Sequence, residues 1–328
     1  MRVIFLFLVT NLAILVVLAA ILQVFKVPNI GFWLIFAFLF GMIGSLVSLV
    51  TSKELAKKAM KVYVIEQPTN PGEVWLVNTI QKLASATGID MPEVAIFDSK
   101  ATDVFATGMS RDNALIVIST GLLHSMSRIE MEAVLGHEVS HIANGDMVIL
   151  TLIQGTVNTF SFLWVRLTVQ IFNHISFVRF FAYGILGVIL IISALTILEK
   201  IVVFIIGYIL IRSALPILEK IVVFIIYVLL AILTVPASII LIWFSRQREF
   251  SADAGSAKLV GADKMIHALH RLQTSHSGQL PEQLGTFGIN SSKNRSLTQY
   301  LFSTHPPFAK RIEALQAKFL INVTGDFK

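Results

Sequence analysis

Long apolar stretches constrain the fold of this chain more than any other feature. A helix needs about 20 apolar residues to cross a bilayer. The chain contains four stretches that approach or exceed this length, residues 3–25, 30–50, 148–172 and 177–244. Only 14% of all residues are charged, whereas soluble domains carry about 25%. The sequence therefore predicts a membrane protein with a hairpin over residues 1–51 and a second membrane region over residues 148–244.

The first stretch, residues 3–25, can be interpreted as a cleaved signal peptide or as a membrane anchor. We favour the anchor, because signal peptides have an apolar core of only about 7–15 residues. The connector to the second stretch holds one lysine, Lys26, whereas Lys53, Lys57 and Lys58 follow the second stretch. Positive residues accumulate on the cytoplasmic side of membrane proteins. The sequence therefore predicts a cytoplasmic N-terminus and a cytoplasmic segment after the hairpin.

Two more polar regions, residues 52–147 and 245–328, are predicted to be soluble. Strands are predicted over Lys61–Glu66, Glu93–Phe97 and Asn113–Ser119, and helices over Pro71–Ala84, Ser127–Asn144, Gln247–Val260, Ala262–Gln273 and from Pro306 onward. Ser127 and Glu130 have the spacing of a capping box at the start of a helix. Residues 275–296 are rich in Gly, Ser and Asn, which indicates a loop.

The fourth apolar stretch contains a tandem repeat, because residues 189–206 recur with few changes at 209–226. Two copies do not make a solenoid, so we interpret the repeat as a local duplication. The third stretch carries polar residues on one helix face at Gln154, Asn158, Arg166 and Gln170. Hydrogen bonding between membrane helices explains this face better than a polar path does.

Residues 136–141 contain the pattern H-E-x-x-H within a predicted helix. His137 and His141 would lie one turn apart on one face, so both imidazoles can bind one metal ion. Glu138 can instead reach a water on that metal, and zinc acidifies such a water enough for a carboxylate to take its proton. Because the chain has no cysteine, zinc ligands must be His or carboxylate. The alternative is a surface helix that merely carries two histidines.

A catalytic zinc needs a third protein ligand. The extended motif that supplies a third histidine fails here, because Asn144 and Met147 stand where glycine and histidine would be. Glu249 and Asp253 lie at positions i and i+4 of a predicted helix, so one carboxylate can bind zinc while the other orients a histidine. The alternative is a solvated helix face on which neighbouring arginines pair with Glu249.

The chain resembles the HtpX membrane metalloproteases, which are similar to the CAAX prenyl proteases within the gluzincin clan. The resemblance rests on the H-E-x-x-H helix, on the early hairpin, and on residues 106–123 (ATGMSRDNALIVISTGLL) and 244–261 (FSRQREFSADAGSAKLVG). It covers most of residues 1–172 and 221–325. It implies an α+β membrane protein with helical transmembrane hairpins and a cytoplasmic gluzincin-type domain, built around the H-E-x-x-H helix and a small β-sheet.

The resemblance also implies roles for individual residues. One Zn2+ per chain would be held by His137, His141 and Glu249, with Asp253 as the supporting partner and Glu138 as general base. Two residues, Phe105 and Gly108, would belong to a substrate-binding edge strand, where Asp-Val-Phe at 103–105 replaces the family's usual Asn-Ala-Phe. His305 and Arg311 would stabilise the oxyanion of the reaction, although the sequence around His305 is also a normal helix start.

The resemblance implies a zinc-dependent endopeptidase of the cell inner membrane that degrades misfolded or damaged membrane proteins in quality control and stress response. Both termini and the catalytic domain would be cytoplasmic, and the partners would be membrane protein substrates and the lipid bilayer. The net charge of +6 is explained by Lys and Arg beside the spans, so nucleic-acid binding is not expected. The sequence leaves open whether the chain forms a homo-oligomer.

Two other functions are consistent with parts of the sequence. An intramembrane protease would bury the motif in lipid, but residues 127–132 are too polar for that position. A non-proteolytic membrane chaperone or scaffold could retain a metal site. The protease requires His141 and Glu249 on one side of the membrane, and hence an even number of spans between them. We favour four spans, because residues 177–218 are too apolar for water.

Overall fold

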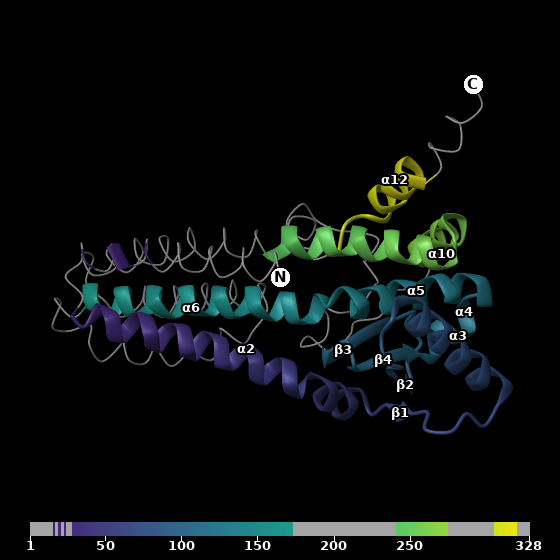
Figure 1. Ribbon diagram of the computed structural model, residues 1–328, viewed down its shortest axis with the longest axis horizontal. Helices are drawn as coiled ribbons and strands as arrows, with labels where there is room; N and C mark the ends of the chain where they lie inside the picture. Colours follow the sequence, from purple (N-terminus) through teal and green to yellow (C-terminus); the bar gives the residue numbers. More distant parts are fainter. Residues whose placement is uncertain are drawn as a thin grey trace, which may run out of the picture. The chain divides into compact units, whose positions relative to one another are not determined.

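The computed structural model describes residues 28–172, 241–274 and 305–319, together with Val16, Ala19, Ala20 and Gln23 (Figure 1). It divides into two compact units, Met1–Leu46 with Thr151–Leu241, and Val47–Leu150 with Ile242–Lys328. Most of the predicted span over residues 3–25, the repeat over 189–226 and the predicted loop over 275–296 lie outside the described residues. The number of spans between residues 173 and 240 therefore stays a prediction.

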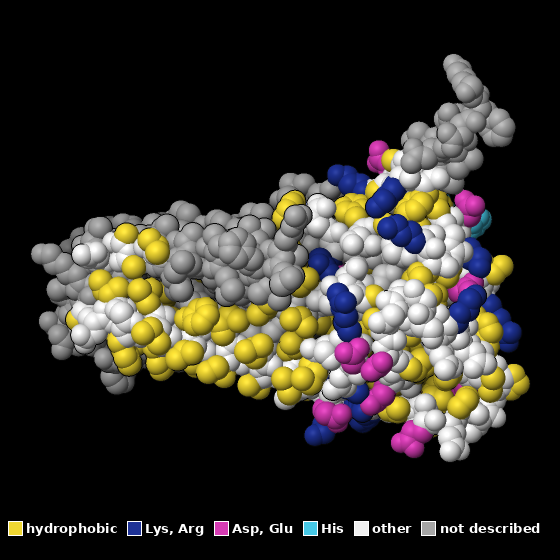
Figure 2. All heavy atoms as spheres, in the orientation of Figure 1, with side chains coloured by type: hydrophobic (Ala, Val, Ile, Leu, Met, Phe, Trp, Pro, Cys, Tyr) yellow, Lys and Arg dark blue, Asp and Glu magenta, His cyan; other side chains and the backbone are white. Residues whose placement is uncertain are grey.

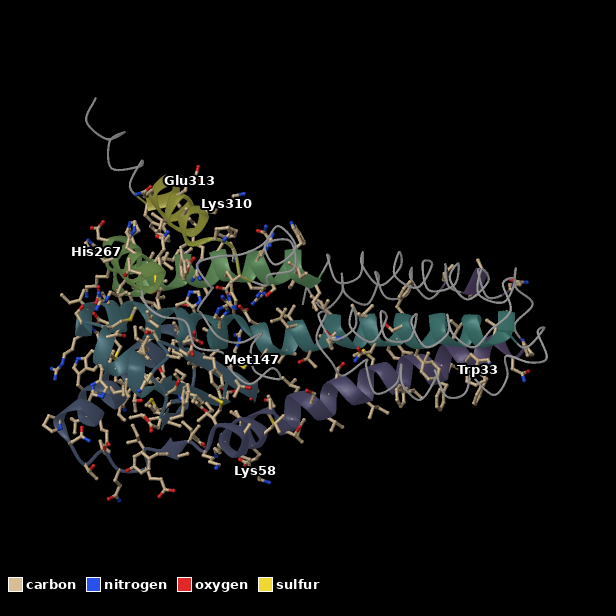
Figure 3. The ribbon with its side chains drawn as sticks, turned by 180° about the vertical axis from the view of Figure 1, so that it is seen from behind. Trp33, Lys58, Met147, His267, Lys310 and Glu313 are labelled. Atoms are coloured by element: carbon tan, nitrogen blue, oxygen red, sulfur yellow. The ribbon has the colours of Figure 1, made fainter. Side chains whose placement is uncertain are left out.

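Two long apolar helices contribute to the first unit. They are α2 (Ile30–Met60) and α6 (Asp146–Phe172), and within the described residues both are long and apolar enough to cross a membrane. Trp33 and Lys58 mark the two ends of α2 in Figure 3. The helix is longer than the predicted span over 30–50, because it continues through the lysine-rich segment to Met60.

The two helices pack closely where small residues meet. A side chain at Gly41 would lie 2.6 Å from the backbone nitrogen of Thr159, so only glycine permits this approach. Gln154 donates to Asn158 over 2.8 Å, and Asn158 donates to Ser45 of α2 over 3.1 Å. Two of the four predicted polar residues therefore serve helix packing, as expected. The side chains of Arg166 and Gln170 lie outside the described part.

The second unit contains a four-stranded sheet in the order β1-β2-β4-β3. The strands are β1 (Tyr63–Val64), β2 (Glu93–Phe97), β3 (Val104–Ser110) and β4 (Asn113–Ser119). The β2–β4 pair is parallel and the other two pairs are antiparallel. Strand β3 lies at one edge of the sheet, and its pairing with β4 shifts register between Gly108 and Ser110.

Helices cover this sheet, and their ends follow the capping signals of the sequence. They are α3 (Pro71–Thr87), α4 (Thr120–Ser125), α5 (Arg128–Asn144), a helix over residues 241–260, α10 (Ala262–Thr274) and α12 (Phe308–Phe319). The predicted capping box of Ser127 and Glu130 is confirmed at the start of α5. Helix α4 was not predicted; the side chain of Ser119 caps its start.

The hydrophobic core lies on both faces of the sheet. The larger cluster joins one face to α3, α5, α10 and α12, and the smaller one joins Phe105 and Leu115 to Ala56 of α2. Helix α5 is almost completely buried from Met131 to Ile142. In contrast, Lys310 and Glu313 extend from the exposed face of α12 (Figure 3). The helix that carries the H-E-x-x-H motif is thus the central element of the unit.

Candidate metal centre

The two motif histidines face the carboxylate of Glu249. His137 and His141 lie one turn apart on α5, and their Nε2 atoms are 3.0 Å from each other. Glu249, from the helix over residues 241–260, places Oε1 3.3 Å from His141 Nε2 and Oε2 3.7 Å from His137 Nε2. These three residues form the group that could hold a metal ion among the described residues.

Small residues allow the two ligand-bearing helices to approach each other. A side chain at Gly136 would lie 2.9 Å from Ser256 Oγ, and one at Gly255 would lie 2.4 Å from Ser140 Oγ. Ser256 donates across the contact to the backbone oxygen of Ala133 over 2.6 Å. Each helix thus places a serine against a glycine of the other. This reciprocal pairing brings Glu249 within reach of the histidines.

Carboxylates behind the histidines determine which ring nitrogens face Glu249. Asp253 lies 2.9 Å from His137 Nδ1, and Asp146 lies 2.6 Å from His141 Nδ1. When Nδ1 of a histidine donates its proton to a carboxylate, Nε2 keeps the lone pair that binds metal. Both lone pairs are therefore available on the side where Glu249 lies.

The spacing of these atoms fits a zinc ion. Two ligand atoms at the usual zinc distance of about 2.0–2.1 Å lie roughly 3.3 Å apart in a tetrahedral site. The three separations of 3.0, 3.3 and 3.7 Å bracket this value. Two histidines with one carboxylate are also a common ligand set of catalytic zinc. The residues present therefore fit the metal that the motif indicates.

Interactions within the site determine the charge states of the ligands. Burial lowers the pKa of His137, and its hydrogen bond to Asp253 offsets this effect only in part. Burial opposes ionisation of Glu249 as well, but His305 and Arg311 outweigh it and hold the pKa of this carboxyl well below its usual range. A neutral imidazole and a carboxylate are the forms that bind metal.

Glu138 directly follows His137 on α5, so its side chain leaves the helix in a different direction from the two histidines. It is buried, and burial raises the pKa of its carboxyl to about 8. The backbone amide of Ala106 in strand β3 donates to this carboxylate. Among the described residues, Oε1 has no hydrogen-bond partner. One oxygen is thus fixed to the edge strand, and the other can take a proton from a reacting group.

His305 and Arg311 both lie beside Glu249. His305 Nδ1 is 3.0 Å from Glu249 Oε2, and Arg311 Nη1 is 3.2 Å from the same oxygen. Arg311 is completely buried and donates through Nε and Nη2 to the two oxygens of Asp253, over 2.8 and 2.6 Å. The proposed contact with an oxyanion stays a prediction for both residues. The geometry adds a second task for Arg311, which is to hold Asp253.

The two predicted substrate-binding residues both lie in β3. The side chain of Phe105 is fully buried in the smaller core cluster, so a substrate could meet only the backbone of this residue. Gly108 has a φ of 142°, and a side chain there would lie 2.3 Å from the backbone oxygen of Asn113. Their role in substrate binding stays a prediction.

Two residues of the site were missed by sequence reasoning. Asp146, the first residue of α6, accepts from His141 Nδ1, and Arg248 forms an ion pair with Asp146. The sequence held one signal for Asp146, which follows the second histidine by five residues across the glycine that ends α5. The sequence offered Arg248, which directly precedes Glu249, only as one of the neighbouring arginines that could pair with Glu249 on a solvated face.

Comparison with known proteins agrees with this geometry. Residues 72–318 match the model of peptidase family M48. Protease HtpX of Thioalkalivibrio sulfidiphilus is 44% identical and aligns over 97% of this chain and 99% of its own length. Protease HtpX of Aeromonas hydrophila is 46% identical over 96% and 100%. The crystal structure of Ste24p from S. mikatae has a similar fold, with a TM-score of 0.53 at 18% identity, covering 92% of this chain and 62% of that one.

The fold and the site define a metallopeptidase, in which one buried helix carries the two histidines and Glu138. The family match spans most of the chain, and the relatives align with it from end to end. The chain belongs to peptidase family M48. The resemblance to the HtpX proteases that residues 106–123 and 244–261 indicated is confirmed by these relatives.

Proposed function

We propose that this chain is a zinc-dependent endopeptidase that acts at the cytoplasmic face of the cell inner membrane. One observation carries the proposal, namely the convergence of His137, His141 and Glu249 on one point beside Glu138. Each histidine is held by a carboxylate through Nδ1, so the arrangement is specific for a metal ligated through Nε2. Zinc bound there supplies an acidified water and polarises the peptide carbonyl.

The residues around the metal have distinct tasks in this proposal. Glu138 takes a proton from the attacking water at Oε1 and passes it to the leaving amine. The backbone amide of Ala106 keeps the other carboxylate oxygen of Glu138 in place. His305, buried beside Glu249, is the candidate donor to the oxyanion. The outer edge of β3, which pairs with no further strand among the described residues, would align an extended substrate backbone beside Glu138.

A membrane setting is supported by the exposed apolar surface of α2. Phe32, Ile35, Ile43, Val47 and Val50 are each more than half exposed. Figure 2 shows hydrophobic side chains along this helix. Such a surface is unfavourable in water and natural in lipid. We propose a multi-pass protein with both termini in the cytoplasm, whose substrates are misfolded or damaged membrane proteins.

Two substitutions test the proposal in the full-length protein purified in detergent. Glu138→Gln should retain zinc and lower casein cleavage by about 10²–10⁴-fold, because the general base is removed. Glu249→Ala should lower both the zinc content and cleavage, because a ligand is lost. Metal content is measured by elemental analysis and cleavage by peptide release.

A matched control is Glu132→Ala. Glu132 lies on the same helix as Glu138 but away from the metal ligands, and the substitution removes its ion pair with Lys264. This variant should keep zinc and activity. Unchanged cleavage in Glu138→Gln would refute the protease assignment. A wild-type protein that holds zinc but cleaves neither casein nor a membrane protein would favour the non-proteolytic chaperone or scaffold.

A further inference from the structure

Each of the two histidines is supported by a carboxylate, and each carboxylate by an arginine. His137 contacts Asp253, which accepts two hydrogen bonds from Arg311. His141 contacts Asp146, which forms an ion pair with Arg248. We call each set of one histidine, one carboxylate and one arginine an arm. The first arm contains the aspartate of the Glu-x-x-x-Asp pattern on the helix that carries Glu249. The carboxylate and the arginine of the second arm, Asp146 and Arg248, lie outside both the H-E-x-x-H and the Glu-x-x-x-Asp motif.

The second arm connects three elements of the unit. His141 lies in the last turn of α5, Asp146 begins α6, and Arg248 directly precedes Glu249 on the helix over residues 241–260. Asp146 directs Oδ2 to His141 and Oδ1 to Arg248. Arg248 also donates to the backbone oxygen of Asn144 at the end of α5, over 3.5 Å. The arm therefore joins the second histidine ligand to the residue beside the third ligand.

We infer that Asp146 and Arg248 are positioning residues of the metal centre, an inference that rests on the proposed zinc site. Asp146 fixes the ring of His141 with Nδ1 as donor, so that Nε2 is the metal-binding atom. Arg248 fixes Asp146 from the helix that carries Glu249. The angle between the histidine and carboxylate ligands is then determined by the arm before zinc arrives.

Burial makes a purely structural role for Asp146 costly. Its side chain is only 3% exposed, and burying an unpaired carboxylate strongly destabilises the folded state. The helix dipole stabilises an acid at the first residue of a helix only weakly, which is too little to offset that cost. The contacts with His141 and Arg248 provide the compensation. The carboxylate is therefore placed where the metal ligand needs it.

Substitutions at Asp146 separate the two roles. Asp146→Ser keeps a residue suited to a helix start, but its hydroxyl is too short to reach His141. Asp146→Ser and Asp146→Ala should each bind zinc about 10–100-fold more weakly, as measured by competition with a chelator in the full-length protein. Asp146→Asn keeps an acceptor for Nδ1 and should lose less. The control Glu132→Ala should bind zinc like the wild type, because Glu132 pairs with Lys82 and Lys264 and with no residue of the metal centre.

Arg248 is expected to act through Asp146. Arg248→Ala should weaken zinc binding in the wild-type background and change it little in Asp146→Ala, as in a double-mutant cycle for coupled residues. Arg248→Lys retains the charge and should recover part of the affinity. These milder variants keep the inference testable if Asp146→Ala fails to fold.

The outcomes distinguish this inference from the proposed function. Wild-type affinity in both Asp146→Ser and Asp146→Ala would overturn the positioning role and leave the zinc site intact. Additive effects of Asp146→Ala and Arg248→Ala would overturn the coupling between the two residues. A wild-type protein without zinc would overturn both the inference and the proposed function. If only Glu249→Ala lost zinc, and the Asp146 and Arg248 variants kept it, the result would support the proposed function and overturn the inference.

Discussion

Asp103 is a buried carboxyl whose substitution should stabilise the protein. It directly precedes the edge strand β3, its side chain is 3% exposed, and its backbone amide donates to Ser119 Oγ. Burial raises the pKa of Asp103 from its ordinary value of 3.8 to about 6. The HtpX proteases, which this chain resembles, usually have asparagine at this position. Asp103→Asn replaces the ionisable group with a neutral one of the same shape.

The pKa of Asp103 gives the size and the pH range of the effect. The difference between about 6 and 3.8 corresponds to about 3 kcal/mol, since each pH unit is worth about 1.4 kcal/mol. Below about pH 4 the carboxyl is protonated in both the folded and the unfolded chain, so it costs nothing. Between about pH 4 and 6 the unfolded chain loses its proton first, and the folded state loses stability as pH rises. Above about pH 6 the full cost applies.

The measurement compares the unfolding temperatures of the wild type and Asp103→Asn in detergent between pH 4 and 8. The variant should unfold about 6–12 °C higher at pH 7, because each kcal/mol shifts the Tm of a domain this size by about 2–4 °C. This gap in unfolding temperature between the wild type and Asp103→Asn should vanish near pH 4. Asp112→Asn, at an exposed position in the β3–β4 turn, should show no gap. A gap that does not depend on pH, or a less stable variant at pH 7, would refute the reasoning.

Two further predictions concern close contacts between helices. Gly255→Ala should destabilise the fold by about 1–3 kcal/mol through overpacking, and so lower the Tm, and it should weaken zinc binding, because the new carbon would lie 2.4 Å from Ser140 Oγ. A thermal melt with chelator competition checks both effects, and unchanged values would contradict the packing. In the membrane, the double variant Ser45→Cys/Asn158→Cys should form a disulfide on oxidation, because the two side chains are in contact. The chain has no other cysteine that could compete. Adding Gly41→Leu should abolish this cross-link by separating α2 from α6, and its persistence would contradict their contact.

Features with a local sequence code were predicted well. The capping box of Ser127 and Glu130 is confirmed at the start of α5, and β2 and β4 have the predicted bounds. The structure also brings His137, His141 and Glu249 together. The cap and the strands were predicted because capping and strand patterns depend on residues only a few positions apart. Glu249 is distant from the histidines in the sequence, and its place beside them was implied by the family resemblance.

Other features that depend on distant partners were not predicted from the residues themselves. Asp146 and Arg248 are 102 positions apart and meet only in the folded unit. The edge strand β3 was expected only from the family resemblance, because β4 determines its pairing. The predicted strand over Lys61–Glu66 shrinks to Tyr63–Val64, since β2 pairs with only two of its residues. Periodicity describes one element at a time and cannot supply such partners.

Gly145 is the single residue between α5 and α6, and it adopts a φ of 70°. An inserted residue at this point would turn the following helix by about 100° and carry Asp146 away from His141. Insertions and deletions should therefore be rejected here during evolution. The chain tolerated a 20-residue duplication between residues 189 and 226. Family members should thus vary in length within the apolar region and keep one invariant spacing between the second histidine and the aspartate.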